Sequence, residues 1–150
     1  MKTIITLISF FCAMSFLNAK GIEVGQEVPD LTAVNQNNET VDLGEELSQG
    51  ITLLFFYPKA DTPGCTAQAC SLRDSFHELV GKGVKIYGVS YDSPKAQAKF
   101  IEKYDLPFDL IADEDKKVSK AFDRGFFDRQ AYLIKDGNVI WRDLKASTKT

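Results

Sequence analysis

The run "ITLLFFY", residues 51–57, constrains the fold of this chain most strongly, because every residue in it is apolar, aromatic or β-branched. A strand with one face in water alternates apolar and polar side chains, whereas a continuous apolar run of this length is typical of a strand buried on both faces. Such strands occur where helices cover both sides of a sheet. Pro58 follows and ends the strand. The run therefore predicts an α/β architecture.

Helical and strand patterns alternate along the rest of the chain. Apolar residues at helical spacing predict one helix over residues 65–80, with an inward face formed by Ala69, Leu72, Phe76, Leu79 and Val80. The run "VKIYGVS", residues 84–90, predicts the next strand. Ser93 followed by Pro94 is a favourable N-cap and first-turn pair for a helix through Tyr104.

Shorter patterns complete the predicted architecture. Two short strands joined by "NQNN" are expected at residues 31–34 and 40–42. The segment "FDLIAD" predicts a strand, "EDKKVSKAFD" a helix, and "AYLIKDGNVIWRD" a hairpin around Asp136 and Gly137. Strands that alternate with helices and end in a hairpin predict an α/β sandwich with a mostly parallel central sheet.

The first 19 residues have the layout of a secretory signal. Lys2 precedes an apolar run that ends at the small residue Ala19, as a charged region, an apolar region and a cleavage site do in such signals. We expect cleavage after Ala19, which would leave one domain over residues 20–150 in the periplasm or outside the cell. An uncleaved membrane anchor is the alternative. The formal net charge of -3 with interspersed lysines and acids predicts no nucleic-acid partner.

Only two cysteines follow this segment, Cys65 and Cys70. A close pair in an exported protein is often a structural disulfide. In an intact helix, however, residues five apart have Cα atoms roughly 8 to 9 Å from each other, and a disulfide needs about 7 Å or less. A pair that bridges only when a helical turn unwinds favours a redox switch. Zinc is a weaker interpretation, because His77 would supply only a third ligand and is expected to be an ordinary helix residue.

The residues before Cys65 refine the redox interpretation. A thiol in the first turn of a helix lies near free backbone N–H groups and the positive end of the helix dipole, which favour the thiolate. Thr62 places a hydroxyl three residues before the thiol, and Pro63 and Gly64 form a tight turn into the helix. This arrangement would suit a small oxygen-containing substrate. Alternatively, Thr62 is only a helix cap.

The segment "PKADTPGC", residues 58–65, matches the P-x-x-x-T-x-x-C signature of the peroxiredoxins. On this segment, and on "GVSYDSPKAQAKFIEKYDLPFDLIAD" and "RQAYLIKDGNVI", the chain resembles these thiol-dependent peroxidases, which have a thioredoxin-like fold. The second cysteine in "CTAQAC" resembles the subgroup called peroxiredoxin Q or bacterioferritin comigratory protein. The likeness covers about residues 22 to 142. It implies a mixed, mostly parallel sheet flanked by helices, with an N-terminal β-hairpin.

The resemblance also implies roles for individual residues. Cys65 resembles the peroxidatic cysteine of the family, and Cys70 the resolving one. Pro58 would shield the thiolate from solvent, and Thr62 would hydrogen-bond the thiolate and the peroxide. The active-site arginine of the family precedes a late strand. This points to Arg129, which is separated from "AYLI" by one residue.

Three further residues near Arg129 have open interpretations. Arg124 is a competitor for the role of active-site arginine, although Arg129 has the better offset from the strand. Phe126 and Phe127 would either be simple packing residues or wall an apolar entrance that favours alkyl peroxides.

The chemistry that the resemblance implies requires no cofactor and no metal. The thiolate attacks hydrogen peroxide or an organic hydroperoxide, and the resulting sulfenic acid condenses with the second thiol to form a disulfide. An external dithiol reductant, either a thioredoxin-like protein or a small thiol, restores the pair. The expected biological role is antioxidant defence, with a monomer as the expected state and a dimer as the alternative. Outside the cytosol, the usual thioredoxin donor is absent, so the resemblance does not identify the reductant.

Two competing functions and one departure from the family remain. An exported thiol–disulfide oxidoreductase of the thioredoxin type would need C-x-x-C and a proline before the late strand, but no proline follows Pro107. A non-catalytic redox-sensing domain is the other alternative. Family members continue past the hairpin into a C-terminal helix, whereas "RDLKASTKT" is short and polar. One face of the sheet is therefore expected to be partly uncovered or to meet a partner chain.

Overall fold

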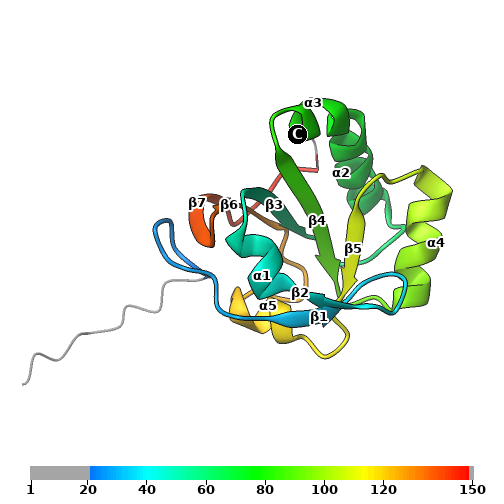
Figure 1. The fold of residues 1–150 in the computed structure, drawn as a ribbon. Helices are drawn as coiled ribbons and strands as arrows, with labels where there is room; N and C mark the ends of the chain where they lie inside the picture. Colours follow the sequence, from blue (N-terminus) through cyan, green and yellow to red (C-terminus); the bar gives the residue numbers. More distant parts are fainter. Residues whose placement is uncertain (1–20, 149–150) are drawn as a thin grey trace, which may run out of the picture.

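A five-stranded sheet forms the centre of the computed structural model, which describes residues 21–148 (Figure 1). Its strands lie in the order β5-β4-β3-β6-β7. The bounds are Ile51–Phe56 for β3, Val84–Ser90 for β4, Asp109–Ala112 for β5, Gln130–Lys135 for β6 and Asn138–Asp143 for β7. β3 pairs in parallel with β4, and β4 with β5, while β6 is antiparallel to both β3 and β7. The sheet is therefore mixed, as the resemblance implied.

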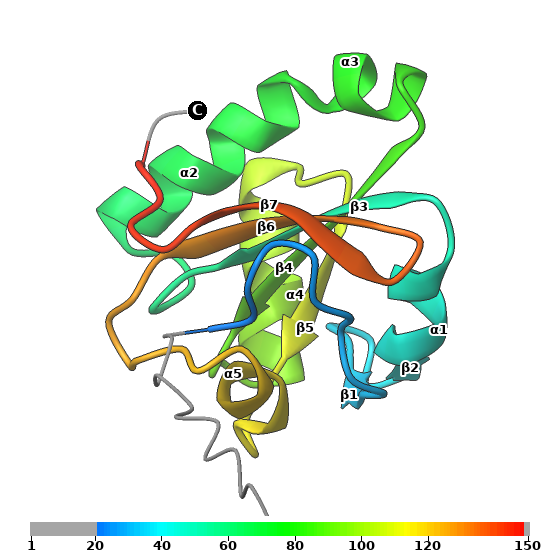
Figure 2. The same cartoon turned by 90° about the vertical axis from the view of Figure 1, so that its left-hand side faces the viewer.

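Helices cover both faces of this sheet (Figures 1 and 2). The first face carries α1, Leu43–Ser48, and α5, Lys117–Ala121. The second face carries α2, Pro63–Asp74, α3, Phe76–Gly81, and α4, Pro94–Tyr104. A separate two-stranded antiparallel sheet consists of β1, Thr32–Val34, and β2, Thr40–Asp42.

The central strand β3 is buried on both faces, as its apolar run predicts. Leu54 and Phe56 belong to the core on the first face, and Phe55 and Tyr57 to the core on the second. Because successive side chains of a strand point to opposite faces, the residues of this run enter the two cores alternately. β3 therefore anchors both layers, and its C-terminal end leads directly to Pro58.

The helix predicted over residues 65–80 is two helices, α2 and α3, separated at Ser75. Ser75 has φ −90° and ψ 0°, and its N–H bonds back to the carbonyl oxygen of Ser71 at 3.2 Å. The change of direction brings the ring of Phe76 to 6.5 Å from that of Phe108. Val80, expected on the inward face, is 47% exposed. The prediction of one continuous helix was wrong because Ser75 redirects the second half.

The sequence patterns did not identify helix α1. The carboxylate of Asp42 accepts a hydrogen bond from the backbone N–H of Glu45 at 2.9 Å and caps the helix. Leu43 and Leu47, four residues apart, are both buried. The pattern of an N-cap aspartate, a glutamate three residues later and an apolar pair was present in the sequence and would have predicted this short helix.

The turn chemistry predicted from the sequence is confirmed at two places. The hydroxyl of Ser93 accepts a hydrogen bond from the N–H of Ala96 at 3.2 Å and caps α4. Between β6 and β7, Asp136 and Gly137 both have positive φ, 48° and 82°, as the two central residues of a type I′ hairpin turn require.

The expected signal, residues 1–19, lies outside the described residues. Within residues 21–148, no helix combines the length and the apolar character needed to cross a membrane.

Asp113 offers a test of how the end of β5 is joined to α5. Its carboxylate is buried and accepts hydrogen bonds from the N–H groups of Val118 at 3.0 Å and Ser119 at 2.8 Å. We expect Asp113→Ala to lower the free energy of unfolding by about 2 kcal/mol, since both buried N–H groups lose their acceptor. Urea denaturation measures this loss. Asp115→Ala, an exposed carboxylate in the same loop, is the control and should change stability by less than about 0.5 kcal/mol. Equal effects of the two substitutions would contradict the capping role.

Candidate active site

Cys65 lies in the first turn of α2, as predicted. Thr62 occupies the N-cap position, Pro63 begins the helix, and the first helical bond runs from the N–H of Thr66 to the carbonyl oxygen of Thr62 at 2.8 Å. The Cys65 side chain is only 1% exposed and packs in the core between α2 and the sheet. The sulfur is therefore held close to the positive end of the helix dipole and away from bulk water.

Arg129 contacts the sulfur directly. Its Nη1 lies 3.2 Å from Cys65 Sγ, although the two residues are 64 positions apart in the chain. The antiparallel pairing of β3 with β6 brings them together, because Phe56 is registered opposite Gln130 and Arg129 directly precedes that pair. A guanidinium at this distance stabilises a thiolate by charge and by hydrogen bonding. The structure thus places Arg129, and not Arg124, at the thiol.

Gln68 is a site residue that the sequence patterns did not identify. It is buried, and its Oε1 accepts a hydrogen bond from Arg129 Nη1 at 3.3 Å. Residues three apart on a helix lie on the same side, so the offset of Gln68 from Cys65 was the available signal. Gln68 and Cys65 together orient the guanidinium.

Gly64 makes room for that guanidinium. A Cβ atom added at Gly64 would lie 2.6 Å from Nη2 of Arg129 and 3.4 Å from Cγ2 of Thr148. Any side chain at position 64 would therefore displace Arg129 or the segment that follows β7.

Thr62 and Pro58 border the N-terminal end of α2. The hydroxyl of Thr62 donates a hydrogen bond to the carbonyl oxygen of Lys59 at 2.8 Å and does not cap the helix. The interpretation of Thr62 as only a helix cap is therefore wrong. Because its proton is directed to Lys59, the hydroxyl oxygen is left as a hydrogen-bond acceptor. Pro58 is half-buried at the start of the same loop.

A buried hydrogen-bond network fixes this loop to the end of β4. Asp92 accepts hydrogen bonds from the backbone N–H of Ala60 at 2.7 Å and from the hydroxyl of Ser90 at 2.6 Å. Gln97 donates to Ser90 at 2.8 Å and accepts from the hydroxyl of Tyr57. Burial raises the pKa of Tyr57, so its hydroxyl remains a donor. The loop that carries Pro58 and Thr62 is therefore tied to the sheet at both Tyr57 and Ala60.

An exposed contact supports the same loop from outside. The carboxylate of Asp61 accepts hydrogen bonds from Lys103 Nζ at 2.9 Å and from the hydroxyl of Tyr104 at 2.7 Å. The hydrogen bond from Lys103 lowers the pKa of Asp61. Exposed pairs of this kind contribute little to stability, so we expect the part-buried contacts of Asp92 and the buried contact of Tyr57 to carry most of the positioning.

Cys70 lies further along α2 and is half-buried. Both cysteines are free thiols in this structure, and α2 is continuous from Pro63 to Asp74. Beyond Cys70, the side chain of Arg73 donates a hydrogen bond to the carbonyl oxygen of Tyr104 at 2.8 Å and ties the C-terminal end of α2 to α4.

The segment after β7 passes beside the site (Figure 2). The N–H of Ala146 donates to the carbonyl oxygen of Arg129 at 2.9 Å, and Ala146 packs against the core on the face of α2. A cavity of about 390 Å³ lies between this segment, α2 and the sheet, with Gln68 and Trp141 in its wall. The polar tail thus covers part of the face that was expected to be partly uncovered or to meet a partner chain.

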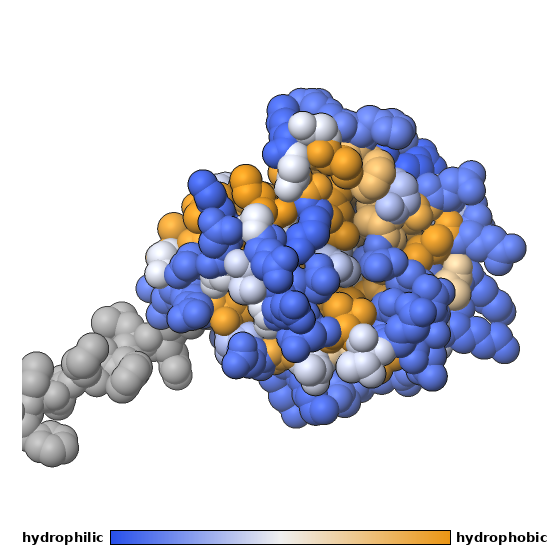
Figure 3. All heavy atoms as spheres, in the orientation of Figure 1, coloured by the Kyte–Doolittle hydropathy of each residue, from blue (hydrophilic) through white to orange (hydrophobic). Residues whose placement is uncertain are grey.

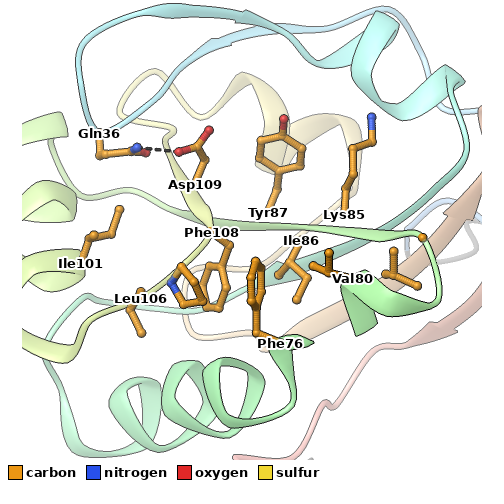
Figure 4. Close-up of a pocket in the computed structure, with 13 residues that line it drawn as sticks. Gln36, Phe76, Val80, Lys85, Ile86, Tyr87, Ile101, Leu106, Phe108 and Asp109 are labelled. Atoms are coloured by element: carbon orange, nitrogen blue, oxygen red, sulfur yellow. Dashed lines mark hydrogen bonds between the residues drawn. The ribbon is translucent and has the colours of Figure 1, made fainter. Parts of the chain in front are cut away.

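A larger groove of about 670 Å³ lies elsewhere, where β5 pairs only with the second half of β4. Its wall includes Phe76, Phe108 and Lys85, and apolar side chains gather around it (Figures 3 and 4). Gln36 and Asp109 close one end with a hydrogen bond of 2.6 Å (Figure 4). None of the predicted site residues lines this groove.

Fold and site together define a cysteine-dependent enzyme on an α/β scaffold, with a buried thiol at a helix N-terminus beside an arginine. The AhpC/TSA family matches residues 24–142. The chain is 41% identical to peroxiredoxin Bcp of Bacillus subtilis over 138 residues, which cover 83% of this chain and 87% of that protein. It is 39% identical to peroxiredoxin Bcp of Escherichia coli, over 81% of this chain and 76% of that protein.

Solved structures agree with this assignment. The crystal structure of peroxidoxin BcpB from Mycobacterium tuberculosis superposes with a TM-score of 0.79 at 31% identity, covering 85% of this chain and 89% of that one. The Xanthomonas campestris bacterioferritin comigratory protein gives 0.75 at 25% identity, over 85% and 88% of the two chains. The chain belongs to the AhpC/TSA family and is a peroxiredoxin of the Bcp/PrxQ subgroup, a thiol peroxidase on a thioredoxin-like fold.

The close approach of Gly64 to Arg129 predicts that a substitution at Gly64 lowers the reaction rate with little change in the free energy of unfolding. Gly64→Ala should lower the rate of Cys65 oxidation by hydrogen peroxide about 10- to 100-fold, because the new methyl group displaces the guanidinium. The free energy of unfolding should stay within about 1 kcal/mol of the wild-type value, since alanine is the better helix former. Rapid mixing and urea denaturation measure the two quantities.

Gly81→Ala is the matched control, because Gly81 is also helical and no atom lies within 4 Å of an added Cβ. It should leave the oxidation rate unchanged. A Gly64→Ala protein that reacts at the wild-type rate would contradict the role given to this close approach.

Proposed function

We propose that Cys65 is the peroxidatic cysteine of this peroxidase and that Arg129, Thr62 and Pro58 form its peroxide site. The observation that supports this most strongly is the 3.2 Å contact between Arg129 Nη1 and a sulfur that is 1% exposed at a helix N-terminus. A cation and oriented N–H groups are the features that stabilise a thiolate where water is excluded, and Arg129 and the first turn of α2 supply both.

In the first step, the thiolate attacks one oxygen of the peroxide in line with the O–O bond. An S–O bond forms, the O–O bond breaks, and the leaving oxygen departs with the electron pair and takes up a proton as water or an alcohol. Arg129 stabilises the charge that develops on the oxygens. Thr62, whose proton is directed to Lys59, accepts the hydrogen bond of the peroxide O–H. Pro58 limits the access of water to the sulfur.

In the second step, Cys70 resolves the Cys65 sulfenic acid. The Cys70 sulfur attacks the oxidised sulfur, an S–S bond forms, and the hydroxyl group leaves as water. Both residues lie in the continuous helix α2, where positions five apart have Cα atoms roughly 8 to 9 Å from each other, so the first turns must unwind. Because both cysteines belong to one chain, this step requires no second subunit, which supports a monomer.

An external dithiol then reduces the Cys65–Cys70 disulfide by thiol–disulfide exchange. Unwinding of α2 would bring the buried sulfur to the surface, where a thioredoxin-like protein or a small thiol can reach it. We propose hydrogen peroxide and organic hydroperoxides as substrates. The Xanthomonas campestris relative, for which alkyl peroxide reduction is described, supports the second class.

Phe126 and Phe127 also support an apolar substrate. They lie just before Arg129 and are 55% and 80% exposed, with their ring centroids 4.8 Å apart. Phe126 also packs on the ring of Tyr91, with the ring centroids 5.4 Å apart. Exposed rings that closely precede the proposed catalytic arginine in the chain would favour substrates with an alkyl group.

We further propose that the protein is exported and that its first 19 residues are removed. The charged residue, the apolar run and Ala19 support this proposal. It would place turnover in a compartment where the reductant differs from cytosolic thioredoxin.

The two cysteines should separate the two steps of the reaction. Cys65→Ser is expected to lose peroxide consumption entirely, because the attacking sulfur is gone. Cys70→Ser should still consume one equivalent of hydrogen peroxide and form a sulfenic acid that dimedone traps, but it should stop before a second turnover with dithiothreitol. Single-turnover and steady-state assays with intact mass spectrometry measure these outcomes. Full turnover by Cys65→Ser would refute the assignment.

Export gives a separate expectation. When the full chain is expressed in a Gram-negative bacterium, the periplasmic fraction should contain a protein whose intact mass begins at Lys20. Leu7→Arg, which interrupts the apolar run, should leave the uncleaved chain in the cells. A full-length wild-type protein in the soluble cytosolic fraction would contradict export.

A further inference from the structure

Arg124 is a buried arginine for which the peroxidase chemistry has no direct use. It lies after α5, is 6% exposed, and places its guanidinium 4.5 Å from the ring centroid of Tyr91 and 5.9 Å from that of Phe56. Burial lowers the pKa of Arg124, and the neighbouring Tyr91 opposes that effect. A buried guanidinium is costly unless its N–H groups find acceptors. Its acceptors therefore show which parts of the chain it holds together.

Two of these acceptors are carbonyl groups next to the peroxide site. Nη2 of Arg124 donates to the carbonyl oxygen of Tyr57 at 2.8 Å, and Nε donates to that of Asp128 at 3.1 Å. The first carbonyl belongs to the peptide bond that precedes Pro58, and the second to the peptide bond that precedes Arg129. One planar group thus holds the peptide on the N-terminal side of two site residues.

The pairing of β3 with β6 does not extend to these two peptides. The register of β3 with β6 ends at the pair Phe56 and Gln130. Beyond it, the N–H of Tyr57 donates to the carbonyl oxygen of Val89 in β4 at 3.1 Å. Arg129 directly precedes β6 and lies outside the paired part of that strand. Arg124 bridges the two segments where strand pairing stops.

We propose that Arg124 is a positioning residue that sets the placement of Arg129 relative to Cys65. This inference rests on the proposed function, in which Arg129 acts on the peroxide. The guanidinium has a rigid fork of donors, so two carbonyls bound to one fork keep a fixed separation. Loss of the fork removes the link between the Asp128–Arg129 peptide and the carbonyl group of Tyr57. A displacement of about 1 Å is enough to cost about 100-fold in rate.

A double-mutant cycle tests whether Arg124 acts through Arg129. The measured quantity is the second-order rate constant for oxidation of Cys65 by hydrogen peroxide, in wild type, Arg124→Met, Arg129→Met and the double variant. Arg124→Met should lose about 10- to 100-fold, and Arg129→Met about 100- to 1,000-fold. The double variant should react within about twofold of Arg129→Met, because a group that acts through Arg129 has nothing left to position.

Two further variants control the experiment. Arg124→Lys keeps the buried positive charge but lacks the fork. In the protein that retains Arg129, it should lower the rate constant for Cys65 oxidation by at least about tenfold. Combined with Arg129→Met, it should lower that rate constant no further. It keeps the cycle measurable if Arg124→Met does not fold, as judged by circular dichroism. Arg142→Met removes an arginine that also bonds a backbone carbonyl, that of Ile22 at 2.9 Å, and should react at the wild-type rate.

The outcomes separate this inference from the proposed function. If Arg129→Met loses rate but folded Arg124→Met and Arg124→Lys do not, the positioning role is overturned and the catalytic assignment stands. If the losses of Arg124→Met and Arg129→Met multiply in the double variant, Arg124 acts independently of Arg129 and the inference is wrong. If Arg129→Met reacts at the wild-type rate, both the proposed role of Arg129 and this inference are wrong.

Discussion

The contact between Arg129 and the buried sulfur of Cys65 is the interaction on which the rest of the site depends. A thiolate enclosed in a core loses its hydration, so its charge must be balanced by fixed groups of the protein. The first turn of α2 supplies oriented N–H groups. Arg129, directly before β6, places its guanidinium 3.2 Å from the sulfur. The other features serve this contact: Gly64 leaves space for the guanidinium, and Gln68 orients it.

The same geometry opposes the next step of the reaction. Cys65, Gln68, Ala69 and Leu72 form the buried side of α2, so packing against the sheet stabilises the intact helix in which the two cysteines are separated. The proposed resolution by Cys70 would require the first part of this helix to leave the core. The far end of α2 is held by Arg73, which bonds the carbonyl oxygen of Tyr104. Under the proposed mechanism, the N-terminal end of α2 unwinds for resolution while Arg73 keeps the other end anchored.

Local patterns predicted most of the architecture and part of the site. The continuous apolar run identified β3, and the helical position of Cys65 was evident from Pro63 and Gly64. The break at Ser75 was missed because the apolar spacing continues through it, and Phe76 beyond the break still faces the core, with its ring 6.5 Å from that of Phe108. Gln68, Gly64 and Arg124 act through contacts with residues that are distant in the chain. Their roles depend on the register of β3 with β6 and on loop paths that no local pattern specifies.

The central claim is that α2 is intact for peroxide attack and unwound once Cys65 and Cys70 are joined. Hydrogen–deuterium exchange measured by mass spectrometry on the reduced and peroxide-oxidised protein tests it most directly. The account predicts that a peptide covering α2, Pro63–Asp74, is protected in the reduced protein and loses much of its protection on oxidation. A peptide covering α4, Pro94–Tyr104, should be unchanged apart from its contact with Arg73. Equal protection of α2 in both states, with the Cys65–Cys70 disulfide confirmed by mass, would contradict it.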